Sequence, residues 1–283
     1  MRLSSLLVLL LISVSTFAQI EDWEGGDLRI GYRISTTKIS PMLMRIEADK
    51  ITYLNGKFSF GSSHLSGLVY SRNVYMDIEA SLTGNLIQSE LLHKRNEVVN
   101  PDGNPIYYNT HKDRGNIQSA SYQHLGLKLA FGGYINEKFG IFAGGQWKWS
   151  SIQSATPDMK SEYIHDDIYL ARPSGSQSGV NLNLMAALPW VFIKAGTEYN
   201  YVKSVMDHSE KTVHSEGNNV FFDLDAQVNP FYGSGKIDWL RVFVKYYYSY
   251  TFMRSGYQEN KINFKPGAQA TEWGFVMGLG FKL

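Results

Sequence analysis

Apolar and polar residues alternate one by one along most of the chain. Between residues 74 and 86, for example, Val74, Met76 and Ile78 share one face, while Asp77 and Glu79 share the other. Because successive side chains of a β-strand point to opposite sides, this period of two predicts strands with one apolar and one polar face. The alternation marks ten segments, which cover residues 28–34, 42–48, 74–86, 122–133, 139–149, 180–188, 191–201, 220–228, 240–252 and 273–283.

The connections between these segments differ in length in a regular way. A soluble β-sandwich also has two-faced strands, so the alternation alone leaves a sandwich and a barrel open. Short turns at one end of the strands and long loops at the other are typical of a membrane-spanning barrel. The short connections are residues 136–138, 189–190 and 229–238, and the long polar ones are 91–117, 154–178, 204–218 and 254–270.

Large aromatic residues recur at one height of the predicted strands. They lie on the apolar face, near the end of each strand that leads to a long loop. Aromatic rings with a polar tip favour the boundary between membrane and water, whereas a soluble sandwich has no reason to align them. These residues form a predicted aromatic belt of Trp147, Trp149, Tyr199, Tyr201, Tyr246, Tyr248, Tyr250 and Trp273.

The start of the chain has the pattern of a secretory signal peptide. A positive start is followed by an apolar run, and Ala18 supplies the small residue before a cut. Removing residues 1–18 takes away one Arg, which leaves 27 − 1 = 26 basic and 26 acidic residues and no net charge. This balance gives no support to a nucleic-acid partner. The absence of Cys excludes a disulfide-held domain, and no later apolar run is long enough to span a bilayer as a helix.

Taken together, these features resemble the small outer-membrane β-barrel proteins of Gram-negative bacteria. The resemblance covers roughly residues 27–283, and it implies an outer-membrane location with contacts to outer-membrane lipids and lipopolysaccharide. It also implies that the apolar last strand, with Phe281 and Leu283 near its end, is a signal for the barrel assembly machinery. The expected fold is all-β, a single transmembrane antiparallel up-and-down β-barrel domain over residues 19–283, with about ten strands.

The segment 50–73 is the least regular part of the pattern. Residues 50–60 predict a hairpin with a turn at Asn55-Gly56, a dipeptide that favours tight hairpin turns. This hairpin is either a periplasmic appendage or a pair of additional barrel strands. The second alternative raises the predicted strand count to twelve.

The polar faces carry charges of both signs, which the barrel would turn towards its lumen. Neighbouring segments carry complementary sets, with Asp223 and Asp225 beside Arg241 and Lys245, and with Asp77 and Glu79 beside Arg45. Two interpretations stay open, an interior filled by ion pairs, as in narrow barrels, and a narrow water-lined pore. The predicted lumen charges are Arg29, Arg33, Arg45, Glu47, Asp77, Glu79, Lys128, Lys148, Lys194, Glu198, Asp223, Asp225, Arg241 and Lys245.

Two short motifs bear on an enzymatic alternative. His64-Leu65-Ser66 resembles part of the site of outer-membrane lipid A deacylases, because a His two residues from a Ser shares its strand face and can act as its base. His165-Asp166-Asp167, with the pair Asp223 and Asp225, resembles the omptin proteases in residue type, but the order along the chain is reversed.

The sequence therefore predicts a structural or interaction protein or a narrow solute pore, with an outer-membrane hydrolase as the alternative. Three adjacent residues such as 165–167 do not converge easily on one ion, and no phosphate-binding loop or zinc spacing is present, so we expect no cofactor and no metal. The long loops carry exposed tyrosines, which makes an extracellular or envelope protein partner a further expectation.

Overall fold

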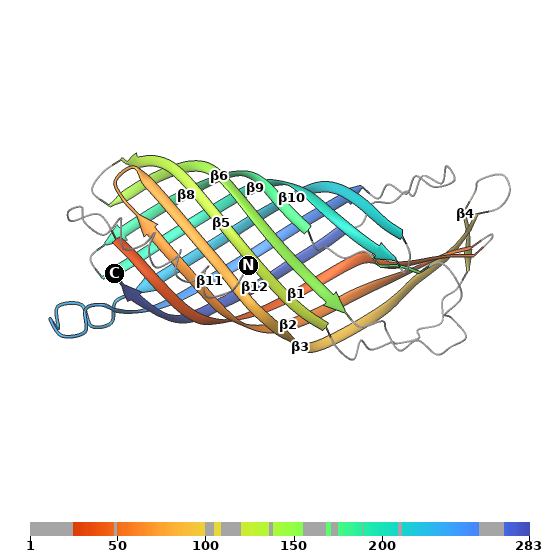
Figure 1. Ribbon diagram of the computed structural model, residues 1–283, viewed down its shortest axis with the longest axis horizontal. Helices are drawn as coiled ribbons and strands as arrows, with labels where there is room; N and C mark the ends of the chain where they lie inside the picture. Colours follow the sequence, from red (N-terminus) through yellow and green to blue (C-terminus); the bar gives the residue numbers. More distant parts are fainter. Residues whose placement is uncertain are drawn as a thin grey trace.

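The computed structural model describes residues 25–47, 50–99, 105–108, 120–135, 138–154, 168–170, 175–188, 190–208, 211–254 and 269–283 of the chain. The predicted signal peptide lies outside these residues. The wall of the molecule is a tilted sheet closed on itself (Figure 1). Its strands are β1 (Gly25–Glu47), β2 (Lys50–Tyr70), β3 (Val74–Val99), β5 (Ala120–Tyr134), β6 (Phe139–Ser154), β8 (Gly175–Leu188), β9 (Val191–His208), β10 (Lys211–Val228), β11 (Leu240–Arg254) and β12 (Gln269–Lys282).

Every wall strand pairs antiparallel with its neighbours, in an up-and-down order. The ladder between β1 and β12 runs from Asp27 opposite Lys282 to Ser40 opposite Gln269, and it closes the barrel, so that neither strand has a free edge along this ladder. Two further strands, β4 (Pro105–Tyr108) and β7 (Ile168–Leu170), only extend the sheet beside β3 and β1. The sheet therefore has twelve strands and the barrel has ten, which confirms the predicted fold class.

The short connections all lie at one end of the barrel, together with both ends of the described wall. The backbone N–H of Leu283 donates to the carbonyl of Gly26 over 2.8 Å, which ties the last strand to the first at this end. In the turn between β10 and β11, Gly233 and Gly235 have φ angles of +83° and +68°. Side chains other than Gly are strained there, which explains the glycines of this turn.

The boundaries around residues 40–60 differ from the prediction. Segments 28–34 and 42–48 are two parts of the single strand β1, whose register shifts between Ile39 and Leu43, next to Pro41. The predicted hairpin of residues 50–60 is wrong, because β2 runs unbroken through Asn55 and Gly56, which pair with β3 along the ladder. The prediction thus counted β1 as two strands and did not count β2 as a wall strand. The two errors cancel, so the predicted number of ten strands agrees with the structure.

The strand ends opposite the short turns extend further than predicted. The connection 204–218 is largely strand, since Lys211 of β10 pairs with His208 of β9. The first three strands are the longest, with 23, 21 and 26 residues against 14–18 in the other wall strands. Beyond Ser40 of β1 and Asn85 of β3, these two strands and the part of β2 between them continue past the rest of the barrel, with β4 beside the tip of β3. We call this part the β-projection (Figure 1). Among the described residues, no helix is long and apolar enough to cross a membrane.

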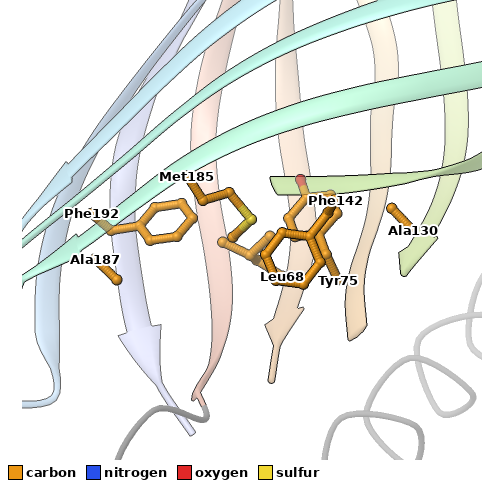
Figure 2. Close-up of a cluster of buried hydrophobic side chains, with 7 residues drawn as sticks. All are labelled: Leu68, Tyr75, Ala130, Phe142, Met185, Ala187 and Phe192. Carbon is orange, nitrogen blue, oxygen red and sulfur yellow. The ribbon is translucent and has the colours of Figure 1, made fainter. Parts of the chain in front are cut away.

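The two faces of the wall are chemically opposite. Large apolar side chains such as Ile30, Leu127 and Val242 point outward and remain about half exposed. Polar and charged side chains point inward and are buried. At the short-turn end the interior is instead apolar, where inward side chains from six strands pack together (Figure 2). This cluster consists of Leu68, Tyr75, Ala130, Phe142, Met185, Ala187 and Phe192.

Candidate functional site

The barrel interior changes character along the strands. On β9, for example, the inward residues run from the apolar Phe192 at the short-turn end, through Lys194 and Glu198, to Asn200. The order differs on β10, which has Gln227 and Asp225 at its short-turn end, but charges from several strands meet in the middle of the interior. The charged layer is the largest concentration of reactive groups in the described part of the chain, which makes it the candidate site.

The middle layer is one connected network of four lysines and four carboxylates. Its side chains come from six strands on different sides of the barrel, so the network crosses the interior. All eight residues are at most 8% exposed. The opposite charges are equal in number, so the network as a whole is neutral. Its members are Asp77, Glu79, Lys128, Lys148, Lys194, Glu198, Asp223 and Lys245.

Two carboxylates connect most of this network. The carboxylate of Glu198 lies 2.8 Å from Nζ of Lys128 and 2.5 Å from Nζ of Lys148. Asp223 lies 2.7 Å from Lys194 and 3.8 Å from both Lys128 and Lys245. Buried charges are costly unless they are paired, and here each cation contacts at least one carboxylate.

The two carboxylates of β3, Asp77 and Glu79, belong to the network and also contact uncharged side chains. Glu79 accepts from Lys245 over 2.6 Å, and its other oxygen lies 2.9 Å from Nε2 of His124. Asp77 accepts a hydrogen bond from the hydroxyl of Tyr75 over 3.0 Å, and that hydroxyl accepts one from Lys194 over 2.9 Å. Both oxygens of Glu79 and one oxygen of Asp77 thus contact polar groups of the protein.

A second cluster of charged side chains, also without net charge, lies nearer the short turns. Arg29 donates to Asp225 over 2.6 Å and to Gln227 over 2.5 Å. Gln227 in turn donates to Asp27, whose carboxylate lies 3.6 Å from Arg241. Two arginines therefore face two aspartates, and the amide of Gln227 joins the pairs.

A third cluster lies on the other side of the network, towards the strand ends opposite the short turns. Arg33 is enclosed by two aromatic rings, with its guanidinium carbon 5.1 Å from the ring centroid of Tyr122 and 4.4 Å from that of Tyr247. It donates to Glu272 over 3.1 Å, and the two tyrosine hydroxyls donate to the same carboxylate oxygen. Beside this group lies a polar cavity of about 30 Å³, lined by Thr37, Tyr122, Ser150, Gln177, Ser249, Thr251, Ala270 and Glu272.

Twelve of the fourteen predicted lumen charges lie in these three groups. The side chains of Arg45 and Glu47 fall outside the described residues. The predicted pairing of β10 with β11 is confirmed in part, since Asp225 lies opposite Lys245 in the ladder and Asp223 lies 3.8 Å from Nζ of Lys245. Shorter contacts, however, cross the interior, where Asp225 pairs with Arg29 and Lys245 pairs with Glu79. Arg45 is not beside Asp77 and Glu79, because it lies on the β-projection opposite Thr52.

Sequence reasoning missed Asp27 and Glu272 as interior charges. Asp27 precedes the first clear alternation, and Glu272 is next to Trp273, with which the last predicted segment began. Their positions at even spacing from Arg29 and Val276 were the available signal, since residues two apart on a strand share a face.

The enzymatic motifs are not assembled as a hydrolase site in the described residues. His64 and Ser66 both face inward and are buried, but Nδ1 of His64 lies 3.4 Å from Ser81. Asp223 and Asp225 are held by lysine and arginine side chains. His165, Asp166 and Asp167 lie outside the described residues. Among those described, no group of three or more His, Cys, Asp or Glu side chains could hold a metal ion.

The predicted belt residues lie on the outward face. All eight alternate with inward residues on β6, β9, β11 and β12, and Tyr199 and Tyr246 are the most exposed, at 55% and 51%. Phe281 lies on the same side of β12 and stacks on Trp239, with ring centroids 5.9 Å apart. The architecture is that of a small outer-membrane β-barrel.

Solved structures with related folds are outer-membrane proteins. One is the protease OmpT from Escherichia coli, with 12% identity and a TM-score of 0.48, where the match covers 94% of this chain and 100% of that chain. A second is OprG from Pseudomonas aeruginosa, with 11% identity, a TM-score of 0.39 and coverage of 94% and 99%. A third is the attachment invasion locus protein Ail from Yersinia pestis, with 7% identity, a TM-score of 0.31 and coverage of 92% and 100%. A comparison with family models found no match, and neither did a comparison with curated proteins.

Proposed function

We propose that this protein is an integral β-barrel of a Gram-negative outer membrane, with an interior filled by its own side chains. It acts as a structural or interaction protein and not as an open pore. The observation that carries the proposal is the neutral eight-residue charge network that crosses the interior.

The outward face supports the membrane location. Its apolar side chains alternate with buried polar ones on strands such as β5, β9 and β11, as expected when lipid replaces water outside a closed barrel. A soluble protein would expose an unusually large apolar surface in this arrangement. Because the backbone groups of the wall pair around a closed ladder, the barrel satisfies the hydrogen bonding that lipid cannot supply.

The interior contacts support the absence of conduction. The apolar cluster lies on the short-turn side of the network, and its residues Tyr75 and Phe142 have no exposed surface. The Arg33 group and the cavity of about 30 Å³ lie on the opposite side of the network. A cavity of this size holds about two water molecules. Ten-stranded walls are also narrow enough for side chains to fill, whereas porins with aqueous channels have about 16–18 strands.

The β-projection supports an interaction role. The strands β1, β2 and β3 continue beyond the rest of the wall, and β4 and β7 widen them at the end opposite the short turns. If the short turns face the periplasm, as in bacterial barrels, the projection lies outside the cell. An extended sheet in that position offers a surface to another molecule without any change in the wall.

Three measurements test the proposal. The protein is expected to fractionate with the outer membrane and to migrate differently on gels before and after boiling. Purified and reconstituted in planar bilayers, it is expected to show no single-channel steps. The triple variant Lys128→Ala/Lys148→Ala/Glu198→Ala lacks three side chains of the network. It shows in the same assay what conductance a more open interior would give. Regular conductance steps of the unchanged protein would contradict the filled interior and favour a narrow pore.

A further inference from the structure

Two lysines lie side by side on the outward face, where that face changes from apolar to polar. Lys38 of β1 is directly opposite Lys57 of β2 in the ladder. Their chain neighbours Thr37 and Phe58 point inward and are buried at 2% and 0%, so the lysines point away from the interior. Opposed residues of an antiparallel pair have Cβ atoms only about 4.5–5.5 Å apart, which brings two positive charges close together.

The position along the strands matches a membrane interface. Towards the short turns, the outward residues of β1 are Ile30 and Tyr32, which are about half exposed. Beyond Ile34 the outward positions become polar, since the hydroxyl of Thr36 lies 2.9 Å from that of Ser59 on β2. Lys38 follows directly, so it is the first outward charge of β1 beyond the apolar band.

An aromatic ring positions one of the lysines. Nζ of Lys38 lies 5.1 Å from the ring centroid of Trp273, a member of the outward aromatic belt. Tryptophan rings prefer the headgroup level of a bilayer, which places this ammonium group at the same depth as lipid phosphates. The ladder neighbours of Lys38 are Thr271 and Lys57, neither of which is acidic.

The charges of this row are not balanced by the ladder. Glu90 of β3 lies opposite Lys57 on its other side, so the row Thr271–Lys38–Lys57–Glu90 has two positive charges and one negative. Like charges directly opposite each other destabilise a sheet unless something between them is negative. The interior groups, by contrast, contain equal numbers of opposite charges.

We propose that Lys38 and Lys57, with the ring of Trp273, bind the phosphate of a phosphorylated glycolipid in the outer leaflet. The inference rests on the proposed function, because it takes the outward face to lie in that leaflet. The phosphate lies between the two ammonium groups and offsets their repulsion, while Trp273 holds the stem of Lys38 and packs against the lipid. Anionic headgroups attract lysines at a membrane surface by Coulomb interaction that salt weakens.

The chain offers a matched control on the same face. Lys203 of β9 is also outward and exposed, and its Nζ lies 5.8 Å from the ring centroid of Tyr201. In the ladder, however, it lies directly opposite Glu216 of β10. Lys57 also has a carboxylate on one side, so the difference lies in the second lysine: the ladder neighbours of Lys203 are Ser176 and Glu216, and neither is a cation. A phosphate cannot lie between two ammonium groups there, and Lys203 is not expected to contribute to phosphate binding.

The test uses the full folded chain in non-ionic detergent, with native mass spectrometry to measure lipid binding. The probes are lipid A with two phosphates, lipid A with both phosphates removed, and inorganic phosphate. Lys38→Gln/Lys57→Gln is expected to bind bisphosphorylated lipid A about 30-fold more weakly than the unchanged protein, since each lysine near such a surface contributes about one kcal/mol. Lys38→Gln alone should lose part of this affinity, and Lys203→Gln should lose none.

The outcomes separate the site from the membrane location. Equal affinity of the double variant and the unchanged protein would overturn the proposed site, as would equally tight binding of lipid A without phosphates. Full competition by inorganic phosphate at the same concentration would indicate a site for free anions and would also overturn the lipid assignment. Cell fractionation reports separately on the outer-membrane location, and loss of the site leaves that fractionation unchanged. The gel shift on boiling verifies that each variant is folded.

Discussion

Replacing Glu198 by Gln tests whether the buried network stabilises the barrel. Glu198 lies 2.8 Å from Lys128 and 2.5 Å from Lys148, and its side chain has no exposed surface. After the change, Lys128 retains Asp223 at 3.8 Å, whereas Glu198 was the ion-pair partner of Lys148. Breaking a buried pair by removing one partner costs about 3–5 kcal/mol, because a charge is left without compensation. We expect the free energy of unfolding to fall by about that amount.

Urea titration of the folded protein in detergent gives this free energy, with the boiled and unboiled gel bands reporting the folded fraction. Glu216→Gln, an exposed position on the outward face of β10, serves as the control and is expected to change stability by no more than about 0.5 kcal/mol. The double variant Glu198→Gln/Lys148→Met removes one charge of each sign and should recover most of the loss. If Glu198→Gln behaves like the control, or the double variant is no more stable than the single one, the argument from charge pairing is refuted.

Three further predictions address the wall and the apolar cluster. Gly144→Ala should destabilise the barrel by about 1–3 kcal/mol because its Cβ would overlap the backbone of β5, whereas Gly145→Ala meets only a carbonyl at 3.8 Å and should be neutral in the same urea titration. Phe142→Ala empties a fully buried position of the apolar cluster and should cost about 3–5 kcal/mol, and an unchanged urea midpoint would contradict that packing. Phe281→Ala should reduce the amount of folded protein in the outer membrane of expressing cells, as measured by the gel shift on boiling, and unchanged amounts would remove Phe281 from the assembly signal.

The faces of the strands could be predicted because they depend on a local rule. Each inward residue is two positions from the next, so Lys194 and Glu198 were assigned to the interior from β9 alone. The same rule placed Tyr199 and Tyr201 outward. Nothing beyond the strand itself is needed for such assignments, and ten strands with two faces leave few architectures other than a barrel or a sandwich.

The ends of strands and the partners of charges could not be predicted in this way. Pro41 and Asn55-Gly56 are ordinary signals for a break, yet β1 continues past Pro41 after a shift of register, and β2 pairs with β3 straight through Asn55 and Gly56. The partners of Arg29 and Lys245 lie 196 and 166 residues away along the chain. Such contacts depend on the diameter of the barrel and on strand tilt, which no short segment of sequence contains.

The charge network also makes strand register specific. On β10, Asp223 meets Lys194 and Asp225 meets Arg29, so two carboxylates two residues apart serve different cations. A slip of β10 by two residues preserves the inward and outward faces, and the hydrophobic pattern alone would therefore tolerate it. In the slipped register, however, Phe221 or Asp225 would occupy the place of Asp223. With Phe221 in that place, three buried lysines would lose their carboxylate partner. With Asp225 in that place, Arg29 would lose the carboxylate that it pairs with. Because an uncompensated buried charge costs several kcal/mol, the interior charges penalise a slip that the alternation permits.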